Sequence, residues 1–167
     1  CKVLGANDLD SLSGCAAQSE RLRKNYNVHP ELSDSIQRLC NAFEPGTYVR
    51  PHSHSDEGRW ELFVLLRGRG AVLTFDDTGR VLERIDFNQE GGASLVEIPP
   101  RAIHAIVSLE RGTVFFEVKP GPYRVATDKD FAQWAPEEGA PATVDWVNWY
   151  EVAQPGEVFG GEPSRCP

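Results

Sequence analysis

The sequence predicts an all-β protein, an antiparallel sandwich or barrel preceded by a short helix. Short runs rich in Val, Ile, Leu and Phe follow one another from Ile36 onward, and turn-forming segments such as Glu44-Pro45-Gly46 and Asp76-Asp77-Thr78-Gly79 separate them. No long helical pattern lies between these runs, which disfavours units of alternating strand and helix. The 167 residues fit one domain whose core is large enough to fold without disulfides.

The first two dozen residues predict a short helix. Asn7 or Asp8 is suited to its N-cap, because a side-chain oxygen there can accept a free backbone N–H. A partial apolar stripe supports the helix and consists of Leu9, Leu12, Ala16 and Leu22. Arg21, Arg23 and Lys24 close the segment with positive charge, as the C-terminal end of a helix favours.

The chain divides into a helical and extended lead-in over residues 1–30, a barrel over 31–125 and a C-terminal tail over 126–167. Within the barrel, residues 71–87 are typical of one β-hairpin. The tail loses the regular spacing of the strands, so we expect an irregular segment packed on the outside of the barrel, with a loose end. Its aromatic residues are Trp134, Trp146, Trp149 and Tyr150.

The charge balance argues against nucleic acid as a partner. There are 17 Lys and Arg residues against 25 Asp and Glu residues, a formal net charge of −8, and no basic stripe alternates with aromatic residues. No apolar run approaches the roughly 20 residues that span a bilayer, and no signal segment opens the chain, so membrane insertion is not expected. The four cysteines, Cys1, Cys15, Cys40 and Cys166, form no CxxC pair, which favours reduced thiols in a cytoplasmic protein.

Three of the four histidines and one glutamate suggest a metal site. His52 and His54 are two residues apart, so on a strand both imidazoles point to the same face. Glu61 lies on the next apolar run and His104 on a later one. Three imidazoles and a carboxylate suit one divalent ion such as Zn, Fe, Mn or Ni. An isolated pair of exposed strand histidines would give the same His-x-His pattern, but the surrounding residues favour the metal site.

These surrounding residues resemble the two signatures of the cupin superfamily. The first is matched by Gly46, His52-Ser53-His54, Glu61 and Gly68, and the second by residues 99–104, in which Pro99 precedes His104 by five positions. The resemblance implies a double-stranded β-helix, the cupin jelly-roll barrel, that binds one metal ion through His52, His54, Glu61 and His104. It also implies a homodimer. The loop between His54 and Glu61 is longer than in the general pattern, and Arg101 and Ser108 replace a usual Gly and Asn.

A closer resemblance, from about residue 21 to 139, is to the WbuC-type cupins, which accompany bacterial O-antigen polysaccharide genes. It is carried by RKNYNVH at 23–29, QRLCNA at 37–42, EPGTY at 44–48, WELF at 60–63, EVKPGPY at 117–123 and DKDFA at 128–132. This subfamily has no settled reaction. The genomic association implies a sugar or sugar-nucleotide ligand.

Strand alternation predicts which side chains surround the metal. Tyr48 and Arg50 share the face of His52 and His54 if the strand stays regular past Pro51, and Phe63 shares the face of Glu61. Arg50 could bind a carboxylate or phosphate of a small anionic or polyhydroxylated ligand, or it could pair with an acidic neighbour at the barrel mouth.

Four further polar residues are candidates for the pocket. Gln37 and Asn41 could orient an imidazole, or they could hold an irregular strand edge. His29 is expected at the surface or at a pocket lid. Glu117 is a candidate buried carboxylate, for which a salt bridge to a neighbouring basic residue is the favoured interpretation.

The sequence leaves three functions open. The metal could act as a Lewis acid in an isomerase-like enzyme of polysaccharide biosynthesis, with Glu117 or His29 as the proton-transfer partner. It could be the redox centre of an oxygenase, or it could hold a ligand in a non-catalytic binding protein. A wet, polar pocket would favour an enzyme, whereas apolar side chains closing over the ion would indicate a structural site.

Overall fold

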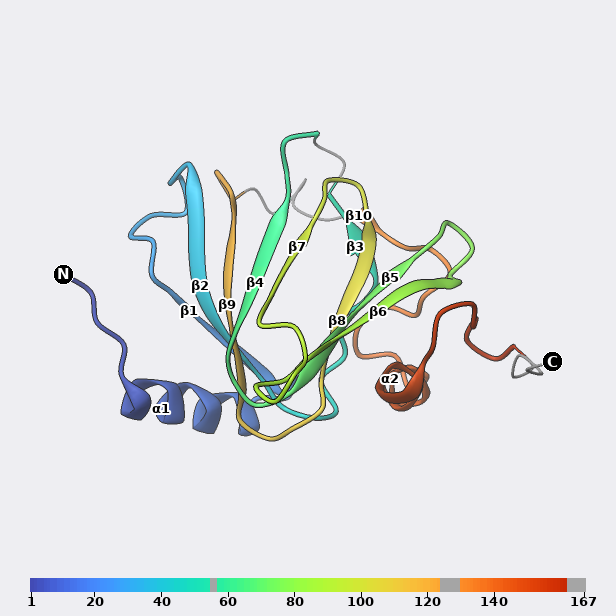
Figure 1. Cartoon of the computed structure of the whole chain (residues 1–167), viewed down its shortest axis with the longest axis horizontal. Coiled ribbons are helices and arrows are strands. Elements are labelled where there is room, and N and C mark those ends of the chain that lie inside the picture. Colours follow the sequence, from blue (N-terminus) through green and yellow to red (C-terminus); the bar gives the residue numbers. More distant parts are fainter. Residues whose placement is uncertain (55–56, 124–129, 162–167) are drawn as a thin grey trace.

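The computed structural model describes residues 1–54, 57–123 and 130–161, and its strands form two five-stranded sheets (Figure 1). The first sheet has the order β1-β2-β9-β4-β7, with strands Arg23–Asn27, Ile36–Phe43, Thr113–Pro120, Glu61–Arg67 and Leu95–Ile98. The second has the order β10-β3-β8-β5-β6, with strands Asp130–Phe131, His52–Ser53, Ile103–Ser108, Gly70–Phe75 and Val81–Phe87. The paired strands of both sheets are antiparallel. The two sheets form a jelly-roll barrel, which confirms the predicted fold class.

The interior of the barrel changes from apolar to polar along its length. Phe115 packs between the sheets against Phe43, Phe63 and Phe87, the last with ring centroids 5.0 Å apart. Successive inward-facing positions are two residues apart, so the inward face of β9 continues from Phe115 to positions 117 and 119. On β4 and β2 the same face likewise becomes polar toward the upper end of Figure 1. The lower half is therefore the hydrophobic core, and the upper half is available for a site.

Helix α1, Ala6–Ala17, packs on the outer side of the first sheet, at the lower end of that sheet in Figure 1. Its apolar side packs on Ala42 of β2 and Val114 of β9. The N-cap is Gly5 rather than the predicted Asn7 or Asp8, and the Gly5 N–H donates to the Asp8 carboxylate at 2.7 Å.

The basic residues expected at the end of this helix lie beyond it. Arg21 and Arg23 instead form ion pairs with Glu138, with N–O distances of 2.6 and 2.8 Å. They connect the start of the first sheet to the C-terminal segment.

The predicted hairpin is confirmed as β5 and β6, which pair from Gly70↔Phe87 to Phe75↔Val81. Its turn is closed by Asp76, whose Oδ1 accepts hydrogen bonds from the backbone N–H groups of Thr78 and Arg80 at 2.8 and 3.0 Å. This is the local hydrogen bonding that makes Asp a frequent turn residue.

The C-terminal tail contains a helix where we expected an irregular segment. Helix α2, Thr143–Val152, packs on the outer face of the second sheet (Figure 1). Tyr150 is buried against Phe75 there, and Trp146 is buried in the same hydrophobic cluster. Thr, Val, Trp and Tyr are poor intrinsic helix formers. Packing of the aromatic side chains decides the conformation of this segment.

Sheet pairing extends beyond the predicted barrel limits of 31 and 125, because β1 belongs to the first sheet and β10 to the second. Cys1, Cys15 and Cys40 are free thiols. Cys166 and the end of the tail, which we expected to be loose, lie outside the described residues. The same is true of residues 55–56 in the long loop after His54. Among the helices described, none is long and apolar enough to cross a membrane.

Candidate metal centre

The four predicted ligands converge on one point between the two sheets. His52 lies on β3 and is paired with His104 of β8, His54 follows β3, and Glu61 begins β4 on the opposite sheet. All four side chains are buried, and their ligand atoms lie within 4.8 Å of one another. Residues separated by up to about a third of the chain are thus brought to a single site, called here the ligand cluster.

Backbone carbonyl groups orient two of the imidazole rings. His52 Nδ1 donates to the Arg50 carbonyl oxygen and His104 Nδ1 to the Ala102 carbonyl oxygen, both at 2.9 Å. A carbonyl oxygen only accepts hydrogen bonds, so the proton of each neutral ring is on Nδ1 and the lone pair is on Nε2. His104 Nε2 is 3.0 Å from Glu61 Oε2, which places that lone pair in the cluster. The side-chain amides of Gln37 and Asn41, proposed above to orient a ring, donate instead to the Leu32 and Asp34 carbonyl groups and to Glu117.

The cluster fits a divalent metal ion. Imidazole nitrogens and a carboxylate oxygen are ligands of Zn and of divalent Fe, Mn and Ni. His54 Nε2 and His104 Nε2 lie 3.1 and 3.0 Å from the two oxygens of Glu61, so the donor atoms already surround a common centre. His52, His54, Glu61 and His104 are therefore the residues that would hold one ion, whose identity this donor set does not fix.

Glu61 is kept ionised by its surroundings. Burial by itself raises the pKa of this carboxyl, but the charge of Lys119, together with the contributions of the neighbouring His104 and His54, outweighs burial and holds the pKa well below its ordinary value. The Lys119 Nζ lies 3.0 Å from Glu61 Oε1 and 2.8 Å from Glu117 Oε1. Glu61 is thus in the protonation state that a metal requires.

Lys119 was missed by the sequence analysis, although a signal was present. It lies two residues after Glu117 on β9, so both side chains point inward. Glu117 forms the ion pair with a neighbouring basic residue that we favoured, and it also accepts a hydrogen bond from Asn41 Nδ2. Asn41, Glu117, Lys119 and Glu61 form a continuous polar network beside the ligand cluster.

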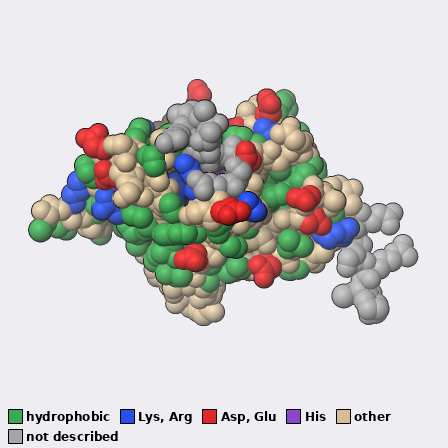
Figure 2. Space-filling model, turned by 90° about the horizontal axis from the view of Figure 1, so that it is seen from above, with side chains coloured by type: hydrophobic (Ala, Val, Ile, Leu, Met, Phe, Trp, Pro, Cys, Tyr) green, Lys and Arg blue, Asp and Glu red, His purple; other side chains and the backbone are tan. Residues whose placement is uncertain are grey.

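A cavity of about 900 Å³ extends from the ligand cluster along the inward face of the first sheet to β1. Its lining contains most of the predicted pocket residues: His29, Gln37, Asn41, Arg50, Phe63 and Glu117. Gln37 Nε2 donates to the carbonyl groups of Leu32 and Asp34, so it holds the loop before β2, as our alternative interpretation expected. Seen from above (Figure 2), the corresponding end of the barrel carries basic and acidic side chains close together.

Arg50 lies in this cavity beside the cluster. Its guanidinium carbon is 5.2 Å from the centroid of the Phe131 ring, and Nη2 donates to the Ala132 carbonyl. Its Nε is buried and has no hydrogen-bond partner in the described part of the chain. Among the described residues, no acidic side chain forms an ion pair with it.

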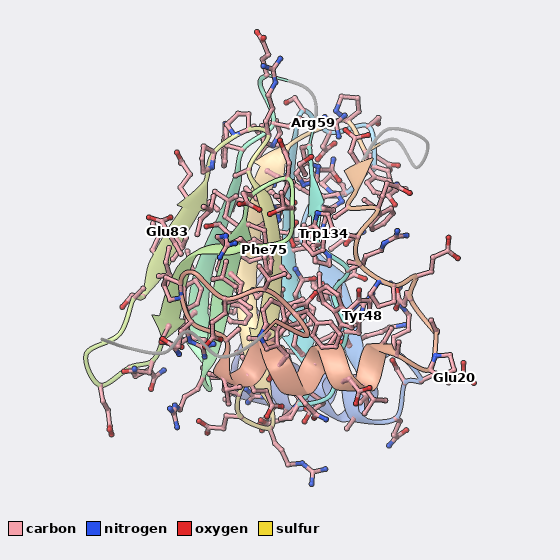
Figure 3. All side chains as sticks on the ribbon, turned by 90° about the vertical axis from the view of Figure 1, so that its right-hand side faces the viewer. Glu20, Tyr48, Arg59, Phe75, Glu83 and Trp134 are labelled. Carbon is pink, nitrogen blue, oxygen red and sulfur yellow. The ribbon has the colours of Figure 1, made fainter. Side chains whose placement is uncertain are left out.

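Tyr48 does not belong to the cavity. Its ring is stacked on Tyr150 of α2 with centroids 6.1 Å apart, and its hydroxyl donates to the Pro136 carbonyl at 2.9 Å. Figure 3 shows Tyr48 next to α2. The predicted alternation fails because β3 begins only at His52, after Pro51, so residues 47–51 are not in a regular strand. Burial raises the pKa of Tyr48 to about 12.

Comparisons with known proteins give distant structural similarities and no activity. No curated protein matches the sequence. Among solved structures, a cupin superfamily protein from Desulfitobacterium hafniense is 19% identical, with a TM-score of 0.45 over 59% of this chain and 76% of that one. KdgF from Halomonas sp. is 19% identical, with a TM-score of 0.47 over 62% of this chain and 82% of that one. Oxalate decarboxylase from Bacillus subtilis is 21% identical, with a TM-score of 0.49 over 65% of this chain, but this chain spans only 27% of that enzyme.

A family model matches the first half of the chain. It covers residues 4–87, which include α1, three of the four predicted ligands and the β5–β6 hairpin, and it describes a domain of unknown function. The protein belongs to this family, DUF6016.

Proposed function

We propose that this protein is a metal-dependent cupin enzyme that binds a small anionic or polyhydroxylated molecule next to one divalent ion. The observation that carries the proposal is that the buried ligand cluster opens on a large cavity lined by both polar and apolar side chains. Small-molecule sites usually measure roughly 300–1,000 Å³, and this cavity of about 900 Å³ falls within that range. A purely structural metal would be closed off from such a space.

The residues of the cavity suggest how a ligand would be handled. When bound, the ion supplies Lewis-acid chemistry, polarising an oxygen atom of the ligand. Arg50 offers its unpaired Nε–H to a carboxylate, phosphate or hydroxyl oxygen. Glu117 is a carboxylate in the cavity wall that could hold or move a proton of the ligand, and Lys119 keeps Glu61 ionised.

The resemblance to WbuC-type cupins suggests that the ligand is a sugar or sugar-nucleotide. It also suggests that the protein acts in polysaccharide biosynthesis. A sugar presents adjacent oxygens that can approach an ion together, and isomerisation moves a proton between neighbouring carbons. An isomerase-like reaction therefore uses both the ion and Glu117.

The first test is the metal content of protein purified without chelator or nickel affinity resin, measured by plasma mass spectrometry. We expect one equivalent of a divalent metal in the wild type and its loss in the His52→Ala/His104→Ala double variant. His29→Asn is the matched control, because it changes a cavity histidine outside the ligand cluster and should leave the metal content unchanged. A wild type that contains no metal and takes none up contradicts the proposal.

The second test follows aldose acids and aldose phosphates by proton NMR with the metal-loaded protein. Conversion of an aldose to a ketose by the wild type, absent in the double variant, supports the isomerase. Oxygen consumption with an iron-loaded protein would indicate an oxygenase instead. Binding of these sugars without turnover would indicate a non-catalytic cupin.

A further inference from the structure

His29 lines the cavity on the side of β1, away from the ligand cluster's second-sheet histidines. His29 is only 4% exposed, and its Nε2 has no hydrogen-bond partner in the part of the chain that the structure describes. Buried polar groups of proteins are almost always paired, and leaving one unpaired is costly. The unpaired Nε2 therefore requires an explanation.

The other ring nitrogen shows which protonation form is present. The backbone N–H of Arg38 lies 3.0 Å from His29 Nδ1, and the Arg38 carbonyl oxygen, 2.9 Å from the same nitrogen, already accepts the N–H of Val28 at 2.8 Å. The N–H and C=O of one strand residue point to the same neighbouring strand, so the Arg38 N–H also points toward β1. A proton on Nδ1 would leave that N–H without an acceptor. The neutral ring thus carries its proton on Nε2, which is a hydrogen-bond donor.

A second unpaired donor lines the same cavity. Arg50 Nε is also buried and without a partner among the described residues. The cavity therefore contains two hydrogen-bond donors without an acceptor from the described residues. A ligand with acceptor oxygens at two places could pair with both.

His29 and the ligand cluster are far apart along the first sheet. β1 and β4 are separated by β2 and β9, which makes three strand intervals of about 4.8 Å each, or roughly 14 Å. His29 lies at the β1 side and Glu61 of the ligand cluster lies on β4. A molecule that reaches both is longer than one sugar ring.

We propose that His29 is a specificity-determining ligand residue: its Nε2–H donates to an oxygen at the far end of an elongated, oxygen-rich ligand whose other end lies at the ligand cluster. The position of the cluster end rests on the proposed function, whereas the donor at His29 does not. His29 then acts as a fixed donor and not as a proton acceptor, a role that the proposed function gives to Glu117.

Two substitutions separate binding from structure. In His29→Asn, the side-chain oxygen replaces Nδ1 as acceptor for the Arg38 N–H, but the Nε2–H donor is lost. In His29→Gln, the amide N–H reaches the position of Nε2, but the contact with Arg38 is lost. A merely structural role predicts that the Gln variant is the more damaging for binding, and the proposal predicts the opposite.

The probes are D-glucuronate and UDP-D-glucuronate, which share an acid sugar and differ in length. Binding to the zinc-loaded full chain is measured by calorimetry, and the protonated nitrogen of His29 is followed in ¹⁵N-histidine NMR spectra. We expect a proton on Nε2 in the free protein and a shift of its signal with UDP-D-glucuronate. We expect His29→Asn to weaken the binding of UDP-D-glucuronate roughly tenfold and His29→Gln to weaken it much less. Neither substitution should change the binding of D-glucuronate.

The proposal is overturned if the proton is found on Nδ1, if UDP-D-glucuronate binds equally well to His29→Asn, or if neither probe binds. Failure of the proposed function gives a different result. A protein that takes up no zinc refutes the metal centre, while the NMR signal and the affinity of the probes for the metal-free chain still test His29.

Discussion

Lys119 places its ammonium group between two buried carboxylates, those of Glu61 and Glu117. Removing this charge in Lys119→Met leaves both carboxylates without their counter-ion in the cavity wall. Breaking a buried ion pair costs roughly 3–5 kcal/mol, so we expect the free energy of unfolding of the metal-free protein to fall by about 3 kcal/mol. Urea denaturation with a chelator present measures the change.

Zinc should restore part of this loss, because the ion replaces the positive charge beside Glu61. The control is Lys24→Met, which removes an exposed lysine of β1 and should change stability by less than about 0.5 kcal/mol. Equal effects of the two substitutions would show that Lys119 does not stabilise the carboxylates.

Glu138 gives a pH-dependent prediction. Burial by itself raises the pKa of its carboxyl, but the hydrogen bond from Arg21 and the charges of Arg23 and Arg21 outweigh burial, so the pKa lies below its ordinary 4.5. A carboxyl with a lowered pKa stabilises the fold above its unfolded-state pKa, and this contribution disappears as the pH falls through the folded-state value.

We therefore expect Glu138→Gln to lower the free energy of unfolding by up to about 1 kcal/mol at pH 7. The effect is modest because the Glu138 side chain is 38% exposed and solvent screens the ion pair. The difference from the wild type should shrink to nothing as the pH falls below 4.5. Urea denaturation between about pH 3 and pH 7, a range that includes the ordinary pKa of a glutamate carboxyl, tests this. Glu137→Gln, at a neighbouring position without a described ion pair, should show no such dependence.

At the scale of elements, α2 is the part of the fold whose stability depends most plainly on a few aromatic side chains. Trp146 is buried and contacts Trp134 and Phe159 with ring centroids 5.8 and 4.3 Å away. We expect Trp146→Ala to lower the free energy of unfolding by about 3 kcal/mol, as large-to-small core substitutions do. Val144→Ala, on the exposed side of the same helix, should have little effect, and thermal unfolding followed by circular dichroism compares the two.

The elements that the sequence predicts best are those whose signals are local. The β5–β6 hairpin follows from a turn at 76–79 between two apolar runs, and the two halves pair over a few residues. Helix α2 was missed because its residues have low helix propensity, and only contact with the second sheet makes the helix favourable. Tyr48 was misplaced because one proline interrupts the alternation on which the prediction relied.

The candidate site follows the same rule. The three histidines and Glu61 could be predicted because their spacing in the sequence is characteristic and each lies beside an apolar run. Lys119 contacts Glu61 across 58 positions of sequence, and no pattern within either strand shows that they are neighbours. The backbone carbonyl groups that orient His52 and His104 have no sequence signature at all.

At the scale of the whole molecule, the ligand cluster joins the two sheets. His52 and His104 come from the second sheet and Glu61 from the first, so an ion bound by all of them links the sheets. We expect zinc at 100 times its dissociation constant to stabilise the wild type by about 2.7 kcal/mol and the His52→Ala/His104→Ala variant not at all. Urea denaturation at fixed protein concentration measures both. Equal stabilisation of both proteins would place the zinc elsewhere.

The carbonyl groups that orient His52 and His104 belong to residues 50 and 102, two positions before each ring on the same segment. The orientation of these two rings is thus set by the local backbone. It does not depend on the side chains of β1 and β2 that form the far wall of the cavity. That wall can change by substitution while the ion-binding end keeps its geometry. Selection can therefore retune the choice of ligand in such a barrel one wall residue at a time, without having to rebuild its metal chemistry.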